Sequence, residues 1–393
     1  MNLDLYFRGY AKINLDYICE NVKALQKKLK ENTGSIAVIK TDGYGHGAVP
    51  IAKVLSDIVD RYAVATVFEA NNLIEHGIKN PIILLGYTQE ATYDLAIEKE
   101  IRMVVYDYEM ARKMNEHAEK LGKKALVNIA LDTGMSRIGF LPTAESVDVI
   151  EQISKLDNIK LEGIFTHFAK ADEYDKQSAK NQFDLYESFL KKLEDRGVNI
   201  PIKHCANSAA VMEMPYTSLN MSRLGIAIYG LYPSEEISRE IELKQAMSLH
   251  SHVIYVKEVE AGSGISYGHT FIADKKMKIA TIPLGYGDGY FRNLSNKGVV
   301  LIKGKRVPIV GRVCMDQFMV DVTGMDVSIG DEVTLIGKDG DEMLTVDEIA
   351  KLAGTFNYEL VCDLGKRVPR VYEYKGKIVG TKDYFHDEYK INI

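Results

Sequence analysis

An alternation of short apolar runs with helical patterns over the first 245 residues constrains the fold most strongly. Each run has the length and composition of a strand buried on both faces, and a stretch of helical period separates most of them. The runs are Ile36–Lys40, Tyr62–Val67, Pro81–Gly86, Arg102–Tyr106, Leu126–Leu131, Leu161–His167, Ile202–Ala206 and Leu219–Gly225. Eight strand-helix units favour a closed (β/α)8 barrel of the TIM type over an open doubly wound sheet.

The pattern changes after about Ser248, where strand-like runs separated by turn signals dominate. The runs are Val253–Val259, Lys278–Leu284, Val299–Ile302, Arg306–Val310, Phe318–Val322, Glu332–Ile336 and Val368–Tyr374. Only Leu344–Leu352 has a clear helical pattern. We therefore expect an α/β protein with a barrel domain over residues 1–245 and a mainly-β domain over residues 246–393.

Charge and composition exclude several classes of function. The chain has 49 basic and 55 acidic residues, a net charge of −6, and no long run of either sign. This balance argues against a nucleic-acid or membrane-surface protein. No apolar run approaches the length of a spanning helix, and we expect no signal peptide. The four cysteines form no CxxC pair and are typical of reduced thiols, so we expect a cytoplasmic protein.

Lys40 closes the first predicted barrel strand and precedes the glycine-rich segment TDGYGHG. The carboxyl ends of barrel strands meet at one mouth, where catalytic loops lie. A lysine partly removed from water there has a lowered pKa and is a candidate for Schiff-base chemistry. A strand-end lysine that reaches back to water is the ordinary alternative.

Other polar side chains follow the later strands. Arg137 lies in LDTGMSRIGF, His167 ends the sixth run, Asn207 and Ser208 follow the seventh, and Arg223 lies in the eighth. Each has an ordinary explanation, such as a core histidine, an ion-pair partner or a helix cap. Five such residues at one mouth favour a shared site over five coincidences.

This mouth has residues suited to a phosphorylated cofactor. Ser208 and the amides around Gly225 and Ile226 are placed to form a phosphate cradle after strands seven and eight. A lysine combined with a phosphate cradle suggests pyridoxal phosphate. Arg223 has no proton-accepting atom, so a pyridine nitrogen beside it stays neutral.

The chain resembles the alanine racemase family, fold-type III pyridoxal-phosphate enzymes with a barrel and a C-terminal β domain. The motifs that carry the resemblance run over nearly the whole chain. They are AVIKTDGYGHG, LDTGMSRIGF, the His167 segment, RLGIAIYGLYP, GSGISYGHTF, GYGDGY, VGRVCMDQFMVDVT and NYELVCDLGKRVPRVY. The resemblance implies a homodimer with shared active sites that interconverts L- and D-alanine and supplies D-alanine for peptidoglycan.

The resemblance also implies roles for individual residues. Lys40 is the cofactor lysine and one catalytic base, and Tyr267 of the partner subunit is the opposing base. His167 hydrogen-bonds Tyr267, and Arg137 contacts the cofactor's phenolic oxygen. The implied phosphate-binding residues are Tyr44, Ser208, Gly225, Ile226 and Tyr358, with Asn207 and Arg223 also at the cofactor. On the substrate side, Met315 meets the carboxylate through its backbone, and Tyr286 and Asp316 lie near the entrance.

Chemistry adds one expectation and the family pattern shows one departure. Tyr267 must lose its proton near neutral pH, so we expect a positive neighbour such as His167 or Arg137 to lower its pKa. Many family members carry a carbamylated lysine two residues before the DTGM aspartate, where this chain has Ala130. The contact by which that lysine orients the arginine is therefore absent for Arg137, or another residue supplies it.

Three other functions remain open from the residues. A racemase of another amino acid, such as serine, fits the same scaffold because pocket size is not readable from the sequence. A decarboxylase of the same fold type fits less well with ISYGHTF and VCMDQF. A non-catalytic pyridoxal-phosphate-binding protein would not need Tyr267. The nine histidines show no HExxH spacing, and we expect no metal site.

Overall fold

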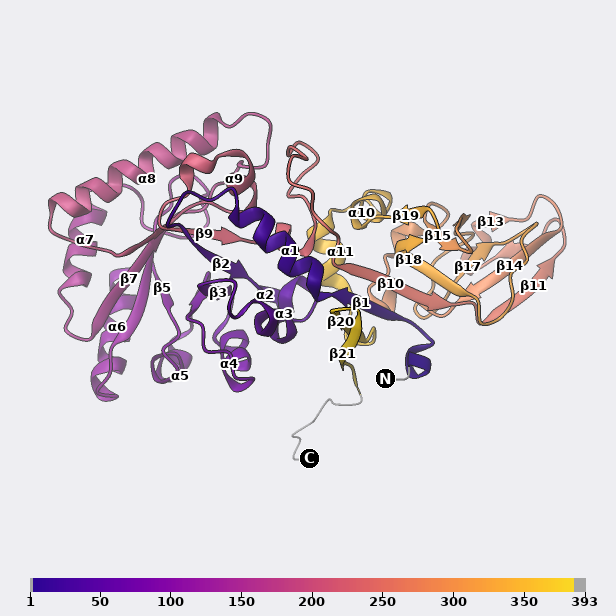
Figure 1. Ribbon diagram of the computed structural model, residues 1–393, viewed down its shortest axis with the longest axis horizontal. Helices are drawn as coiled ribbons and strands as arrows, with labels where there is room; N and C mark the ends of the chain where they lie inside the picture. The colour runs from indigo at the N-terminus through magenta and orange to yellow at the C-terminus, as the bar shows by residue number, and fades with distance from the viewer. Residues whose placement is uncertain (1–2, 385–393) are drawn as a thin grey trace. The chain divides into compact units, whose positions relative to one another are not determined.

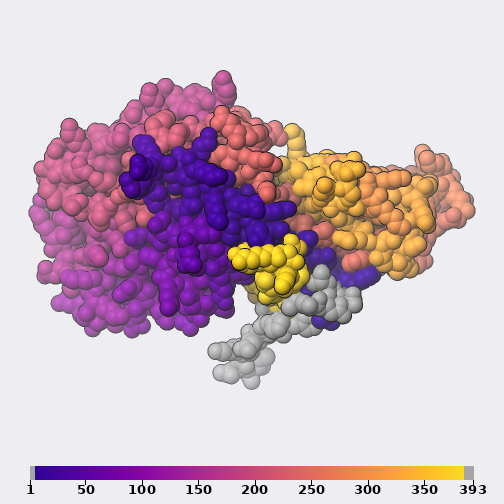
Figure 2. Space-filling view, in the orientation of Figure 1, coloured from indigo at the N-terminus to yellow at the C-terminus, as the bar shows by residue number. Residues whose placement is uncertain are grey.

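A computed structural model describes residues 3–384 as two compact units (Figure 1). The barrel unit contains residues 18–43 and 48–244. The C-terminal unit combines residues 3–17, Tyr44–Gly47 and 245–384. Figure 2 shows the same chain as a surface, with the barrel unit in indigo to pink and the C-terminal segments in orange to yellow.

All eight predicted barrel strands are present, and they pair in parallel. They form two four-stranded sheets, in the orders β4-β3-β2-β9 and β5-β6-β7-β8. The bounds are β2 (Gly34–Val38), β3 (Arg61–Val64), β4 (Ile82–Leu84), β5 (Met103–Val105), β6 (Ala125–Ala130), β7 (Ile159–Phe165), β8 (Ile202–His204) and β9 (Met221–Leu224). A bridge between Ile83 and Arg102 joins β4 to β5, and the Arg223 amide donates to Ala206 O at 3.0 Å beside β8. These links join the two sheets into the predicted barrel.

Helices surround these strands, as Figure 1 shows. The longer ones are α1 (Leu15–Gln26), α3 (Ala48–Leu55), α4 (Val67–Glu75), α6 (Tyr108–Lys120), α7 (Ala144–Ser154) and α8 (Gln177–Asp195). The shorter ones are α2 (Lys40–Tyr44), η2 (Glu90–Thr92), α5 (Tyr93–Glu98), α9 (Ser208–Glu213), η3 (Pro215–Thr217) and η4 (Ile226–Tyr229). Thr66, Asp107, Thr143 and Asn207 cap α4, α6, α7 and α9 by accepting an amide proton of the first turn.

A mixed sheet forms the core of the C-terminal unit. Its strand order is β16-β15-β18-β10-β1-β20-β21, and β19 pairs with β18. A three-stranded sheet β11-β14-β17 and a hairpin β12-β13 complete the β structure. The bounds are β1 (Tyr10–Asn14), β10 (Met247–His252), β11 (Tyr255–Val259), β12 (Gly264–Ile265), β13 (Phe271–Ile272), β14 (Met277–Ile282), β15 (Val299–Ile302), β16 (Lys305–Pro308), β17 (Phe318–Asp321), β18 (Glu332–Asp339), β19 (Glu342–Leu344), β20 (Arg370–Tyr374) and β21 (Lys377–Lys382).

The helices of this unit are short and contain few of its residues. They are η1 (Leu3–Tyr6), η5 (Tyr267–His269), η6 (Tyr286–Asp288), η7 (Arg292–Leu294), α10 (Val346–Ala353) and α11 (Asn357–Asp363). The predicted helix at Leu344–Leu352 corresponds to α10, whereas α11 was not predicted. The unit is mainly β, as the sequence indicated.

The first strand of the chain lies in the interior of the C-terminal sheet. Strand β1 pairs antiparallel with β10, where Ala11 faces Leu249, and parallel with β20, where Ala11 faces Arg370. Ala11 and Ile13 are fully buried. The C-terminal unit therefore needs the first residues of the chain to complete its sheet. In residues 3–384, no helix combines the length and apolar character needed to cross a bilayer.

Candidate active site

Lys40 begins a turn of left-handed backbone at the carboxyl end of β2. Thr41, Asp42 and Gly43 have φ values of 53°, 51° and 63°, and Tyr44 follows at 50°. A residue with a Cβ in this region costs roughly 1–2 kcal/mol. Consecutive left-handed residues persist only where the surroundings enforce them, and such strain concentrates at functional sites.

Hydrogen bonds from the barrel unit hold this turn. The Thr41 amide donates to Glu69 Oε1 at 2.5 Å, and Glu69 Oε2 accepts the Ala65 amide at 2.8 Å. Asp42 Oδ1 accepts the Ala48 amide at 3.0 Å, at the start of α3. The backbone that presents Lys40 is thus fixed from both following helices.

Arg223 is buried in β9, with 3% of its surface exposed. Its Nη2 donates to Thr166 O and Cys205 O, both at 2.9 Å, and to His167 Nδ1 at 3.1 Å. Its Nη1 donates to His204 Nδ1 at 2.7 Å and to His204 O at 3.2 Å. Among residues 3–384 the remaining donor, Nε–H, reaches no acceptor. Burial lowers the pKa of Arg223 to about 10, which leaves it charged at neutral pH.

These contacts determine the protonation of His167 and His204. Arginine is only a donor, so each Nδ1 accepts and each ring carries its proton on Nε2. Burial, with the charges of Arg223, Arg137 and Lys40, lowers the pKa of His167 to about 3. Burial and Arg223 also hold the pKa of His204 well below its usual range. The expectation that His167 is a positive neighbour was wrong, because it is neutral at pH 7 beside a permanent cation.

Arg137 follows β6 in a loop organised by Asp132. The Asp132 carboxylate accepts four successive amides at 2.9–3.1 Å, from Gly134, Met135, Ser136 and Arg137. Burial works to raise the pKa of Asp132, but these four hydrogen bonds outweigh it and lower the pKa. The effect of Arg137 on the pKa of His167 and of Arg223 places its charge near both.

The predicted cradle also assembles within the barrel unit. Ser208 Oγ accepts the Gly225 amide at 2.8 Å and the Ala227 amide at 3.4 Å. Ser208 and Ile226 are buried at the first turns of α9 and η4. Asn207 accepts the Ala210 amide at 3.0 Å, so its side chain is the cap of α9.

Tyr267 lies at the tip of the β12-β13 hairpin in the C-terminal unit. Ser266, Gly268 and His269 all have positive φ, at 63°, 69° and 44°. Ser266 Oγ donates to Arg312 O at 2.7 Å, which fixes the tip. As at Lys40, the backbone at Tyr267 is strained and held by its neighbours.

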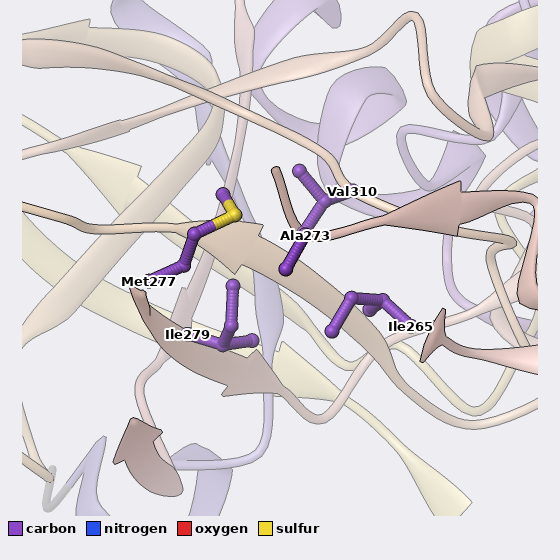
Figure 3. Close-up of a cluster of buried hydrophobic side chains, with 5 residues drawn as sticks. All are labelled: Ile265, Ala273, Met277, Ile279 and Val310. Carbon is purple, nitrogen blue, oxygen red and sulfur yellow. The ribbon is translucent and has the colours of Figure 1, made fainter. Parts of the chain in front are cut away.

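A small apolar cluster anchors the base of this hairpin. Its buried members, shown in Figure 3, are Ile265, Ala273, Met277, Ile279 and Val310. Ile265 belongs to β12 and Ile279 to β14, so the cluster joins the hairpin to the three-stranded sheet. The tip projects from this base, and Tyr267 is 70% exposed.

A pocket of about 500 Å³ opens beside Tyr267. Its lining includes Tyr267, Cys314, Met315 and Asp316. Tyr286 belongs to the adjoining loop, because its amide donates to Cys314 O at 3.0 Å. The predicted substrate-side residues are therefore close together in the C-terminal unit.

Tyr44 and Tyr358 also lie in this unit and pack edge to face, with ring centroids 6.1 Å apart. Burial raises the pKa of Tyr44, so its phenol stays a hydrogen-bond donor. The predicted site residues thus form two groups. Lys40, Arg137, His167, Asn207, Ser208, Arg223, Gly225 and Ile226 are in the barrel unit, and Tyr44, Tyr267, Tyr286, Met315, Asp316 and Tyr358 are in the C-terminal unit.

Three supporting residues were missing from the predicted site: Glu69, Asp132 and His204. Asp132 lies within the DTGM motif, so its position was visible in the sequence although its role was not. Glu69 and His204 lie far along the chain from the residues they support, and the Thr66–Glu69 capping-box pattern indicates a helix start but not the contact with Thr41. Within residues 3–384 no three His, Cys, Asp or Glu side chains are grouped as metal ligands would be.

Comparisons with known proteins cover both units. The family model for the alanine racemase N-terminal domain matches residues 13–233, and that for the C-terminal domain matches residues 246–372. An alanine racemase of Methanococcus maripaludis is 48% identical over 92% of this chain and 98% of its own length. Alanine racemase 2 of Caldanaerobacter subterraneus is 44% identical over 95% and 97%.

Solved structures agree with these sequence matches. Alanine racemase of Clostridium difficile 630 superposes with a TM-score of 0.92 and 45% identity, over 96% of this chain and 98% of that one. The Bacillus anthracis enzyme, solved with bound L-Ala-P, has a TM-score of 0.92 and 36% identity, over 98% and 99%. With both domain models matched in order, and relatives aligned almost from end to end, this chain belongs to the alanine racemase family.

Proposed function

We propose that the protein interconverts L- and D-alanine with pyridoxal phosphate as cofactor, using Lys40 and the partner subunit's Tyr267 as the two bases. The main support is full-length similarity to curated alanine racemases. The two strained, well-held turns that present Lys40 and Tyr267 add a physical argument. A racemase of serine or a non-catalytic binding protein is not favoured by these relatives.

The barrel residues fit the cofactor. The Nε–H of Arg223 donates to no residue among 3–384, and a neutral pyridine nitrogen would accept from it. Ser208, whose Oγ accepts the Gly225 amide, and the Ile226 amide suit a phosphate, and the family resemblance assigns Tyr44 and Tyr358 to the same group. Asn207, as the cap of α9, would hold Ser208 in position. Pyridoxal phosphate, when bound, withdraws electrons and makes the Cα proton of an amino acid acidic.

The chain's own groups then move protons. One base removes the Cα proton from one face, and the other delivers a proton to the opposite face, since a single base tends to return it where it left. His167 carries its proton on Nε2 and can donate a hydrogen bond to the Tyr267 phenolate. Arg137 supplies the positive charge near this site, and the Met315 amide would bind the substrate carboxylate. Tyr286 and Asp316 would border the entrance.

We further propose a homodimer in which the partner's C-terminal unit covers the barrel mouth. Large apolar side chains are exposed after β3, β4, β6 and β7, namely Phe68 at the start of α4 and Tyr87, Leu141 and Tyr174 in loops. Tyr267 and Met315, which line the pocket of the C-terminal unit, and Ile272 in β13 are also exposed. Exposed apolar groups gathered at a site usually mark an interface. Cysteines that form no disulfide among residues 3–384, together with the role of D-alanine in peptidoglycan, suit a cytoplasmic enzyme of cell-wall synthesis.

The direct test combines activity with labelling. The purified protein should form D-alanine from L-alanine much faster than it racemises serine. Borohydride reduction and peptide mapping should place the cofactor on Lys40, and Lys40→Ala should lose both the label and the activity. Lys53→Ala, in α3, is the matched control. A label on another lysine, or faster racemisation of serine, would contradict the proposal.

A further inference from the structure

A network of four charged residues in the C-terminal unit contacts the segment that contains Met315, the residue proposed to bind the substrate carboxylate. It consists of Arg8, Asp288, Asp316 and Arg367, and we refer to it as the arginine–aspartate network. Three of these residues have no role in the proposed reaction. The two arginines balance the two aspartates, so the network does not attract a substrate carboxylate by net charge.

Asp288 is the centre of the network, with 1% of its surface exposed. Both carboxylate oxygens accept from Arg8, at 2.8 Å each, in a bidentate pair. Oδ2 also accepts the Gly285 amide at 2.9 Å, and Arg367 Nε lies 3.5 Å from Oδ1. A buried carboxylate with this many donors fixes the loop that carries it.

That loop is joined to the segment containing Met315. The Gly287 amide donates to Met315 O at 2.9 Å, and a Cβ at Gly285 would lie 2.2 Å from Cys314 O. On the other side, Arg367 Nη2 donates to Asp316 Oδ1 at 2.7 Å. The Met315 amide shares its peptide group with the Cys314 carbonyl, which accepts the Tyr286 amide at 3.0 Å, and within residues 3–384 the Met315 amide donates to no acceptor. The arrangement leaves that amide available while holding its peptide group in place.

We propose that Arg8 is a positioning residue for the substrate carboxylate, acting through Asp288 and the Gly285–Gly287 backbone on the Met315 amide. Arg367 acts on the next residue of the same segment through the Asp316 side chain. Arg8 belongs to the segment before β1, so the start of the chain reaches the substrate loop only through the folded C-terminal unit. This inference rests on the proposed alanine racemase activity.

Arg8→Met removes the bidentate pair and leaves Asp288 underpartnered. The KM for L-alanine should rise about tenfold, the loss expected for a weakened hydrogen bond to a charged group, while kcat changes less. Propionate, which is alanine without its amine, should lose inhibitory affinity by a similar factor. Arg8→Lys keeps the charge but not the fork geometry, so it should recover part of the affinity.

Arg306→Met is the matched control. Arg306 belongs to the same unit, has a similarly exposed side chain (40% against 38%) and pairs with Glu342 and Glu348. It should leave KM and propionate inhibition unchanged. If Arg8→Met does not fold, Arg8→Lys is tested in its place, and its KM and propionate affinity should change in the same direction by a smaller factor. Loss of kcat with unchanged KM and propionate affinity would overturn the proposal.

Amide hydrogen exchange separates this inference from the proposed reaction. In Arg8→Met, segments 285–289 and 314–317 should exchange faster than in the Arg306→Met protein, whether or not the protein racemises alanine. Unchanged exchange in both segments would show that Arg8 does not position the Met315 loop. Absence of alanine racemisation in the unmodified protein would instead contradict the proposed function.

Discussion

Arg223 determines the protonation of two histidines at the barrel mouth. It donates to Nδ1 of both His167 and His204, and its charge opposes the protonation of each. The sequence identified Arg223 and His167 because both lie at the ends of apolar runs. It did not identify His204 as their partner, because that contact depends on how β7, β8 and β9 lie side by side in the closed barrel.

His167 should make the protein sensitive to acid. Its pKa is about 3 in the folded chain against an ordinary 6.5, so the unfolded state binds the additional proton. The free energy of unfolding is therefore unaffected by this histidine above pH 6.5. It falls as the pH drops towards 3, by up to about 5 kcal/mol, because only the unfolded state takes up the proton. In His167→Asn the free energy of unfolding, measured by denaturant at several pH values, should fall less over this window.

His76→Asn is the control for that measurement, because His76 is exposed at the end of α4. It should keep the acid sensitivity of the unmodified protein. If His167→Asn and His76→Asn show the same pH dependence, the lowered pKa of His167 is refuted.

Among the elements, the loop after β6 shows how this chain holds Arg137 without the family's lysine. Ala130 is 1% exposed and packs with Val104 and Phe165, so a charged ammonium group at this position would be removed from water. We infer that Asp132, the aspartate of the DTGM motif, holds the Arg137 loop through the four amides it binds. The sequence revealed the missing lysine and the position of Asp132, but not the four hydrogen bonds to Asp132, since these depend on how the loop folds.

Asp132→Asn should release this loop. The amide group replaces one accepting oxygen with a donor that faces N–H groups, so we expect a loss of about 1–3 kcal/mol in the free energy of unfolding. The value of kcat/KM for alanine should fall because Arg137 is no longer held. Asp321→Asn, which alters a simpler turn beside Thr323, should have a smaller effect on both. Equal effects of the two variants would contradict this role for Asp132.

Strand β1 shows where sequence patterns were insufficient. The barrel strands are buried on both faces and give continuous apolar runs, which the sequence analysis found. Strand β1, YAKIN, alternates buried and partly exposed residues, and it directly precedes the amphipathic segment of α1. A five-residue alternation beside a stronger helical signal is hard to recognise, and its distant partners are invisible in the local sequence.

Ala11→Pro should therefore disrupt the C-terminal unit. Proline removes the amide that donates to Pro369 O at 2.9 Å and cannot be accommodated in a central strand. We expect loss of several kcal/mol in the free energy of unfolding, by about the cost of proline in an ordered element. Ala11→Ser is the control. Cooperative unfolding of Ala11→Pro at unchanged denaturant concentration would show that β1 is dispensable.

At the scale of the whole molecule, the two proposed bases lie in different units of the chain. The sequence predicted an α/β barrel followed by a mainly-β domain, and the structure and family comparisons confirm that division of folds. It did not predict that residues 3–17 and Tyr44–Gly47 join the C-terminal unit. From chain order alone, β1 would be grouped with the barrel segments that follow it in sequence. Its hydrogen bonds instead place it in a sheet with β10 and β20, which lie more than 230 residues further along the chain.

The shared-site proposal makes the most specific prediction at this scale. If Lys40 and Tyr267 of one site come from different subunits, a two-fold dimer has two identical shared sites. Lys40→Ala and Tyr267→Phe proteins should each be nearly inactive. After subunit exchange at equal concentrations, about half of the dimers are hybrids, and each hybrid has one site with both changes and one with neither. Activity should recover to about a quarter of the unmodified value. Mixing two samples of Lys40→Ala is the control and should restore nothing. If mass measurements show that hybrid dimers have formed and activity still does not recover, each chain completes its own site.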